Sequence, residues 1–157
     1  MDINGFGMNI VKIETGKRRF LRLLLVGDES EAMIDKYHDK GDLYVGFIDN
    51  TPIAVCVTVH IDMNMVEIKN LAVLSTYRCQ GFGRKMLEYV ESLYPGKTFT
   101  LGTGETPSTL RFYKSCGYSY SHRLHDFFVN NYPNPSIEEN VTLRDMIYLK
   151  KTLGFNQ

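Results

Sequence analysis

The stretch from residue 70 to residue 87 constrains the fold more than any other part of the chain. It predicts a buried strand, a glycine turn and an amphipathic helix in immediate succession. Gly81 and Gly83 lie in the turn, where glycine allows backbone conformations barred to other residues and brings bare N–H groups close to an anion. The following helix directs its positive end at the same point. Its apolar residues share one face, namely Phe82, Met86, Leu87, Val90 and Leu93. The stretch therefore predicts a phosphate-binding turn.

Two better-known glycine motifs fit this chain less well. The dinucleotide fingerprint G-x-G-x-x-G would need a third glycine where Met86 stands, and a second candidate that starts at Gly102 has Pro107 at that position. The nucleotide P-loop before Gly96 would need a glycine where Glu91 stands. We therefore expect neither a nicotinamide nor a nucleoside triphosphate site. Three basic residues can add charge-assisted bonds to a phosphate at the turn, namely Arg78, Arg84 and Lys85.

Composition limits the classes of partner. The 157 residues are 43% hydrophobic, so we expect residues 1–157 to form a single domain, with residues 1–7 as a loose N-terminal extension. The 18 basic and 18 acidic residues cancel, so no overall field draws the protein to nucleic acid or to an anionic membrane. No apolar run approaches the ~20 residues that span a bilayer, and no secretion signal precedes the first strand. These features predict a soluble, cytoplasmic protein.

The cysteines and histidines give no sign of a metal site. The three cysteines are Cys56, Cys79 and Cys116. They lack C-x-x-C spacing and fit reduced thiols better than a disulfide framework or a zinc site. His122 and His125 are close in sequence, but residues three apart on a strand face opposite sides, so one ion cannot readily bind both. We expect no metal.

Periodicity along the chain predicts a mixed α/β order. A strand at 9–14 precedes a helix at 17–26 and a second helix that Asp28 opens as a carboxylate cap. Three strands with short turns then favour antiparallel pairing, at residues 43–48, 52–61 and 66–74. After the glycine turn and its helix, the pattern predicts a strand at 98–101, a helix opened by Thr106, and strands near 118–128 and 142–149.

This order, with the glycine turn at its centre, resembles the GNAT superfamily of acetyl-CoA-dependent N-acetyltransferases, and bacterial members of unassigned substrate in particular. The superfamily signature Q/R-x-x-G-x-G/A lies between the fourth strand and the third helix, and here it reads Arg78-Cys-Gln-Gly81-Phe-Gly83. A second family element is an aromatic–tyrosine pair followed by a glycine–aromatic pair, matched by Phe112-Tyr113-Lys-Ser-Cys-Gly117-Tyr118. The resemblance implies a mixed α/β (α+β) fold, whose mostly antiparallel sheet has about six to seven strands flanked by about four helices.

The resemblance also implies acetyl-CoA as cosubstrate and a set of residues that hold it. Backbone N–H groups of residues 79–84 would bind the coenzyme A pyrophosphate, and the splayed end of the preceding strand would pair with the pantetheine arm. Thr106 stands where many members carry an asparagine. The implied cofactor-binding residues are Leu71, Ala72, Val73, Arg78, Cys79, Gln80, Gly81, Phe82, Gly83, Arg84, Lys85, Thr106 and Tyr113.

Acetyl transfer to an amine needs a proton acceptor, because a free alkylamine has a pKa of about 10.4 and is mostly protonated at neutral pH. The resemblance points to Glu67 as this base, either with a pKa raised by burial or through a relaying water. A backbone N–H near Leu71 would stabilise the developing oxyanion. Tyr113 resembles the family's general acid, which donates to the departing thiolate. The alternatives are a solvated strand charge for Glu67 and a packing aromatic for Tyr113.

Aromatic residues beside carboxylates near the C-terminus suit a cationic amine, through cation–π and ion-pair contacts. The candidate substrate residues are Asp126, Phe127, Phe128 and Tyr132. The alternative is that this segment is a core strand pair with an ordered loop. We expect direct, sequential transfer to a primary amine of a small molecule or peptide, by a monomer or a homodimer. A sensor that binds acetyl-CoA without catalysis is the alternative function.

Overall fold

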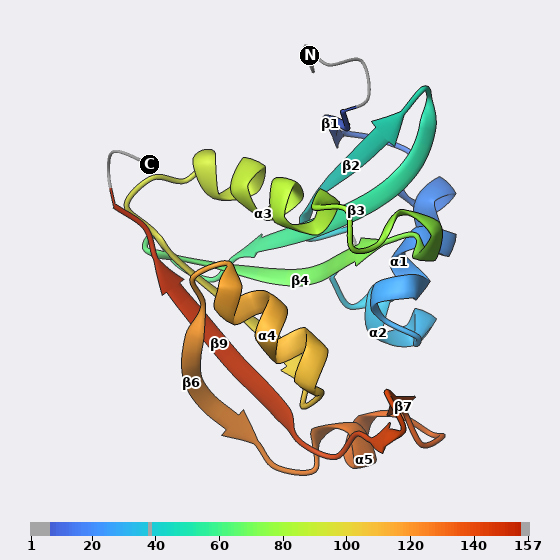
Figure 1. Cartoon of the computed structure of the whole chain (residues 1–157), viewed down its shortest axis with the longest axis vertical. Helices are drawn as coiled ribbons and strands as arrows, with labels where there is room; N and C mark the ends of the chain where they lie inside the picture. Colours follow the sequence, from blue (N-terminus) through green and yellow to red (C-terminus); the bar gives the residue numbers. More distant parts are fainter. Residues whose placement is uncertain (1–6, 38, 155–157) are drawn as a thin grey trace.

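The computed structural model describes residues 7–37 and 39–154 (Figure 1). These residues form a seven-stranded sheet with the order β1-β2-β3-β4-β5-β9-β6. Among its strands only β4 and β5 pair in parallel. The strands are β1 (Asn9–Ile13), β2 (Asp42–Ile48), β3 (Thr51–His60), β4 (Met65–Val73), β5 (Thr98–Gly104), β6 (Ser119–Leu124) and β9 (Met146–Thr152). The predicted mixed, mostly antiparallel sheet is confirmed.

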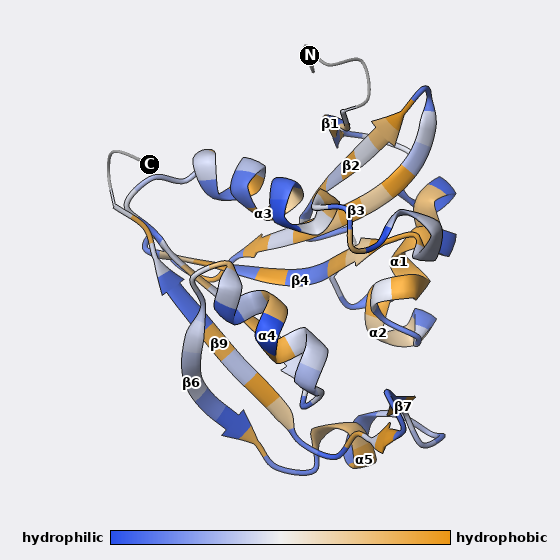
Figure 2. Ribbon diagram, in the orientation of Figure 1, coloured by the Kyte–Doolittle hydropathy of each residue, from blue (hydrophilic) through white to orange (hydrophobic). Residues whose placement is uncertain are grey.

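Helices cover both faces of this sheet and make two cores. On one face, α1 (Leu21–Gly27) and α2 (Glu31–Asp35) pack against β2, β3 and β4. On the other face, α3 (Phe82–Ser92) and α4 (Pro107–Ser115) cover a larger apolar core. Figure 2 shows the hydrophobic residues concentrated in α1 and along the central strands. Two short 3₁₀ turns complete these layers, at Lys17–Phe20 and Ser75–Tyr77.

The helix after the glycine turn buries the face that its periodicity predicts, with one exception. Four of the five predicted residues are buried, namely Phe82, Met86, Leu87 and Val90. Leu93 is instead 42% exposed, because α3 ends at Ser92 and Leu93 only caps it. Burial of this stripe fixes the start of α3, and with it the glycine turn, against the sheet.

The predicted cap at Asp28 is wrong. Ser30 caps α2, and its Oγ accepts a hydrogen bond from the backbone N–H of Met33 at 3.2 Å. Asp28 lies two residues earlier, where its carboxylate accepts the Ser30 backbone N–H at 3.1 Å. A serine in the cap position satisfies the same helix donors, so the Asp28 carboxylate is left for other contacts.

The strand predicted near residues 118–128 is too long. β6 ends at Leu124, and Asp126 adopts a left-handed conformation with φ 54°. The chain then forms the short helix α5 (Phe127–Asn131). A small hairpin follows, made of β7 (Ile137–Glu138) and β8 (Val141–Thr142). Two-residue strands are too short to show a period of two, so the sequence pattern missed them.

Most of the predicted N-terminal extension, residues 1–6, lies outside the described residues. Met8 is 8% exposed and belongs to the larger core. It packs directly on Gly46, where a Cβ would come within 2.2 Å of the Met8 sulfur. In the described part of the chain, no helix is long and apolar enough to cross a membrane.

Candidate active site

The central strands β4 and β5 separate part-way along their length. Their parallel pairing runs from Met65 opposite Thr98 to Ile68 opposite Leu101 and ends there. β5 continues to pair with β9 as far as Gly104, while β4 continues to pair with β3 as far as Val73. Beyond Ile68, the edge of β4 that faces β5 therefore has no strand partner among residues 7–37 and 39–154. An extended ligand with amide groups can add to such an edge like a strand.

A bulge in β4 marks the point of separation. Asn70 lies opposite Val57 while Ile68 lies opposite Thr58, so Lys69 is an extra residue on β4. The bulge turns the Asn70 side chain toward α1, where its Nδ2 donates to the Leu24 carbonyl at 2.9 Å and contacts the Tyr37 hydroxyl at 3.0 Å. Asn70 is 4% exposed, and its Oδ1 has no hydrogen-bond partner in the described part of the chain. Residues after the bulge are thereby held in a fixed position beside α1.

The glycine turn follows β4 and has the geometry that its sequence predicts. Gly81 has φ 89°, a left-handed conformation that favours glycine, and a Cβ there would meet nothing within 4 Å. Gly83 has a different role, since a Cβ on it would lie 3.1 Å from the Phe112 ring. Gly81 therefore shapes the backbone beside an open space, and Gly83 lets α3 and α4 approach closely. Residues 82–84 at the start of α3 line this opening, and the first N–H groups of a helix have no partner within it, so they suit an anion.

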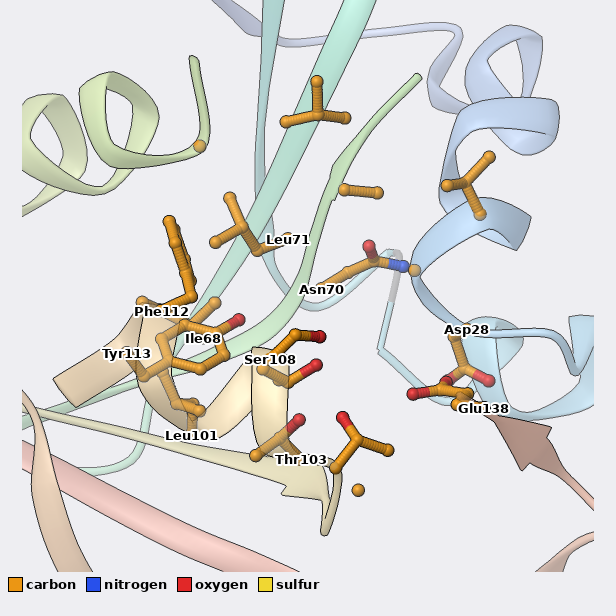
Figure 3. A pocket seen from close by; sticks show the side chains of 18 of the residues that line it. Asp28, Ile68, Asn70, Leu71, Leu101, Thr103, Ser108, Phe112, Tyr113 and Glu138 are labelled. Atoms are coloured by element: carbon orange, nitrogen blue, oxygen red, sulfur yellow. The ribbon is translucent and has the colours of Figure 1, made fainter. Parts of the chain in front are cut away.

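A cavity of about 860 Å³ joins the glycine turn to the gap between β4 and β5 (Figure 3). Most of the residues implied as cofactor-binding line it, namely Leu71, Ala72, Val73, Arg78, Cys79, Gly81, Phe82, Gly83, Arg84, Thr106 and Tyr113. Gln80 and Lys85 are not among the lining residues. The Gln80 side chain donates to the Thr76 carbonyl, and the Lys85 ammonium lies over the Phe82 ring.

Two buried hydroxyl groups face this cavity from α4. Thr106, the residue before α4, is 1% exposed, and its Oγ1 lies near the Glu139 carboxylate without a well-formed hydrogen bond to any described residue. A buried hydroxyl without a partner costs free energy, which a ligand amide would recover. Tyr113 is 9% exposed, and burial raises the pKa of its phenol. The Tyr113 hydroxyl therefore stays protonated at neutral pH and can donate a hydrogen bond.

Glu67 lies near this cavity but does not line it. It is 8% exposed, and its Oε2 is 3.1 Å from the Lys69 ammonium and 3.4 Å from the Tyr148 hydroxyl. Burial, together with the Glu67 charge, raises the pKa of Tyr148 to about 12, so this phenol acts as a donor to Glu67. His122 stacks on the Tyr148 ring at 4.7 Å. A proton from the cavity would have to reach Glu67 through a relay.

Two of the four predicted substrate residues line the cavity, namely Phe128 and Tyr132. Asp126 and Phe127 do not, and the Asp126 carboxylate pairs with Arg144 at 2.8 Å. Within the described chain no group of three or more histidine, cysteine or acidic side chains gathers as a metal site would require.

The sequence analysis did not identify one carboxylate, which lies across the cavity from Tyr113 (Figure 3). Asp28 lines the cavity, and Oδ1 of this residue accepts a hydrogen bond from the Tyr132 hydroxyl at 2.8 Å. Tyr132 is 104 positions away in the sequence, so no local pattern could have signalled the contact. Ser108 of α4 also lines the cavity and was not predicted.

The comparisons decide the family. A family model described as an acetyltransferase (GNAT) domain matches residues 39–120. The chain belongs to the GNAT family. The uncharacterized N-acetyltransferase YvbK of Bacillus subtilis strain 168 is 30% identical to this GNAT protein over 149 residues, covering 90% of the chain and 96% of YvbK.

Solved structures of two GNAT relatives contain the cofactor. A GNAT acetyltransferase from Elizabethkingia anophelis with acetyl-CoA bound is 31% identical and has a TM-score of 0.85. This match covers 93% of the present chain and 98% of the Elizabethkingia chain. A Bacillus subtilis acetyltransferase in complex with CoA is 28% identical and has a TM-score of 0.82. This match covers 94% of the present chain and 99% of the Bacillus subtilis chain. The predicted acyltransferase class and the acetyl-CoA cosubstrate are thus confirmed, which favours the enzyme over the sensor.

Proposed function

We propose that this GNAT enzyme transfers the acetyl group of acetyl-CoA directly to a primary amine of a small molecule or peptide, without a covalent enzyme intermediate. The observation that carries the proposal is a single cavity lined by the glycine turn, by the unpaired edge of β4 and by the α1–α2 turn. Cofactor and acceptor can therefore enter from different sides and meet at the gap. Direct transfer needs the two reacting groups to be held together in this way.

We assign the cofactor to the turn and the gap. Backbone N–H groups at the start of α3 would hold the pyrophosphate, and the β4 edge at Leu71–Val73 would pair with the pantetheine amides. The buried hydroxyl of Thr106, which makes no well-formed hydrogen bond to the described residues, supports a further hydrogen bond to the same arm. Arg84, which donates to the Ser115 carbonyl and hydroxyl, is fixed beside the turn as a positive charge.

The chemical step needs three groups in our proposal. Glu67 accepts the amine proton through a water, because its carboxylate does not line the cavity. A backbone N–H near Leu71 stabilises the oxyanion of the tetrahedral intermediate. Tyr113 donates its proton or a hydrogen bond to the departing thiolate, and its raised pKa keeps that proton in place until needed.

We also propose a cationic amine as acceptor and the cytoplasm as location. Phe128 and Tyr132 line the far end of the cavity with aromatic rings, which attract cations. The free cysteines are compatible with a reducing compartment, and they are Cys56, Cys79 and Cys116.

Thiol release from acetyl-CoA in the presence of a panel of primary amines tests the transfer. Before that, the melting temperature is measured with and without acetyl-CoA. Ligand at a hundredfold over Kd adds about 2.7 kcal/mol, which raises Tm by roughly 5–11 °C for a domain of this size. A rise with acetyl-CoA and with CoA, but not with NAD or ATP, supports the cofactor site. No rise at saturation contradicts it, and thiol release that no amine accelerates contradicts the transfer.

A further inference from the structure

Asp28 is held in a defined orientation at the acceptor end of the cavity. Three donors converge on its carboxylate: the Tyr132 hydroxyl at 2.8 Å, the Ser30 backbone N–H at 3.1 Å and the Tyr37 hydroxyl at 3.4 Å. Tyr37 is in turn bound to Asn70 at the β4 bulge. The carboxylate is therefore fixed relative to the strand edge where acetyl transfer would take place.

The Asp28 charge has no counter-ion among the residues that the structure describes. In residues 7–37 and 39–154, no lysine, arginine or histidine forms an ion pair with it. The basic residues that line the cavity are engaged elsewhere: Lys69 pairs with Glu67, Arg78 donates to the Val73 carbonyl and Arg84 to Ser115. Partial burial raises the pKa of Asp28, and the hydrogen bonds from Ser30, Tyr132 and Tyr37 offset that effect only in part. A cation bound at this point would stabilise the charged carboxylate.

Asp28 and Tyr113 lie at opposite sides of the pocket in Figure 3. The amine that attacks the acetyl group must be neutral, and it must lie near the Tyr113 side, where the thiolate departs. A fixed carboxylate on the other side would stabilise a charged group instead. The same end also carries the Glu138 carboxylate and the rings of Phe128 and Tyr132, whose centroids are 5.4 Å apart.

We propose that Asp28 anchors a second positively charged group of the acceptor, so that the substrate class is a diamine or a larger amine with at least two cationic groups. This inference rests on the proposed function of the same cavity. One ammonium binds between Asp28 and the aromatic rings, and the other amine loses its proton and attacks the acetyl carbon.

The test measures acceptor binding to the CoA-loaded protein by calorimetry, so that no turnover is needed. The probes are 1,4-diaminobutane and 1,6-diaminohexane, each compared with the monoamine of equal length, butylamine or hexylamine. A charge-assisted hydrogen bond predicts that at least one diamine binds about tenfold or more tightly than its monoamine. Asp28→Asn keeps the size of the side chain and an oxygen that accepts from Tyr132, and it should abolish this preference.

Asp49→Asn is the matched control. Asp49 is exposed in the turn between β2 and β3 and does not line the cavity. Its replacement by asparagine changes the net charge by the same amount as Asp28→Asn does. This variant should keep the full preference for the diamine. The comparison of amines on the unchanged protein remains informative even if Asp28→Asn does not fold.

Three results separate this inference from the proposed function. Equal binding of diamines and monoamines overturns the role of Asp28, and so does an undiminished preference in Asp28→Asn. Neither result affects acetyl transfer, which thiol release reports separately. Tight diamine binding without any thiol release would support the anchor and contradict the proposed transfer.

Discussion

Two tyrosines of the same family element allow catalysis and stability to be separated. Tyr113 and Tyr118 are both buried, with ring centroids 5.9 Å apart. The Tyr118 hydroxyl donates to the buried Glu91 carboxylate at 2.8 Å, whereas the Tyr113 hydroxyl has no hydrogen-bond partner among the described residues and faces the cavity. Removing the hydroxyl from each residue should therefore have opposite consequences.

In Tyr113→Phe, no internal hydrogen bond is lost, so the melting temperature should not change measurably. The loss of a positioned general acid should lower kcat by roughly a hundredfold or more. In Tyr118→Phe, Glu91 loses a hydrogen bond to a charged group, which costs about 1.5–3 kcal/mol. For this chain length that cost lowers Tm by roughly 3–12 °C, while kcat should be unchanged.

The assay combines thermal unfolding with single-turnover acetyl transfer, which reports the chemical step rather than product release. Acetyl-CoA binding serves as a control and should survive both substitutions. A Tyr113→Phe enzyme with an unchanged single-turnover rate would refute the general-acid role. A Tyr113→Phe protein that melts as low as Tyr118→Phe would show that the hydroxyl has a structural partner.

Three further predictions follow from individual contacts. Glu67→Gln should lower kcat at neutral pH and leave acetyl-CoA affinity intact, and a pH–rate profile that does not change would remove Glu67 as the base. Gly83→Ala places a methyl group 3.1 Å from the Phe112 ring, which costs about 1–3 kcal/mol; the helix propensity of alanine returns up to about 1 kcal/mol, so chemical denaturation should report a net loss of about 0–2 kcal/mol. A backbone hydrogen bond and Arg123 lower the pKa of Asp145. Its stabilising contribution is therefore present above the ordinary value of about 3.9 and lost as the pH falls through the lowered value. In Arg123→Met, Tm should therefore fall less steeply as the pH is lowered than it does in the unchanged protein. The same pH dependence of Tm in both proteins would argue against the Arg123–Asp145 ion pair.

The glycine-turn end of the cavity could be predicted from the sequence because its geometry is encoded locally. Residues 70–87 contain the strand, the turn and the helix start, and the positive φ of Gly81 is the conformation that its glycine predicts. The helix periodicity fixes which side faces the core. The GNAT signature adds specificity, because it places a second element, Phe112-Tyr113, at the correct distance. Phe112 then meets Gly83 in the folded chain.

The proposed acceptor end could not be predicted in the same way, because local signals there were ambiguous. Aspartate, as at Asp28, often caps helices, but serine is equally suited, and Ser30 is the N-cap of α2. Phe127, Phe128 and Val129 form a short apolar run that resembles part of a strand, but the left-handed Asp126 ends the strand before them. In both places the outcome depends on contacts with residues far away in the chain.

Those distant contacts come from one segment, residues 127–143, which crosses the end of the cavity. On the α1–α2 side, Tyr132 donates to Asp28 and Ser136 to Glu29. On the α4 side, Glu139 accepts the Ser108 backbone N–H at 3.3 Å. The two halves of the sheet pair directly only over residues 65–68 of β4, so beyond that point this segment connects them. The proposed acceptor end is thus built from contacts between residues more than 30 positions apart in the sequence. Its chemistry can therefore be inferred only once the fold has brought Asp28, Phe128 and Tyr132 to one cavity.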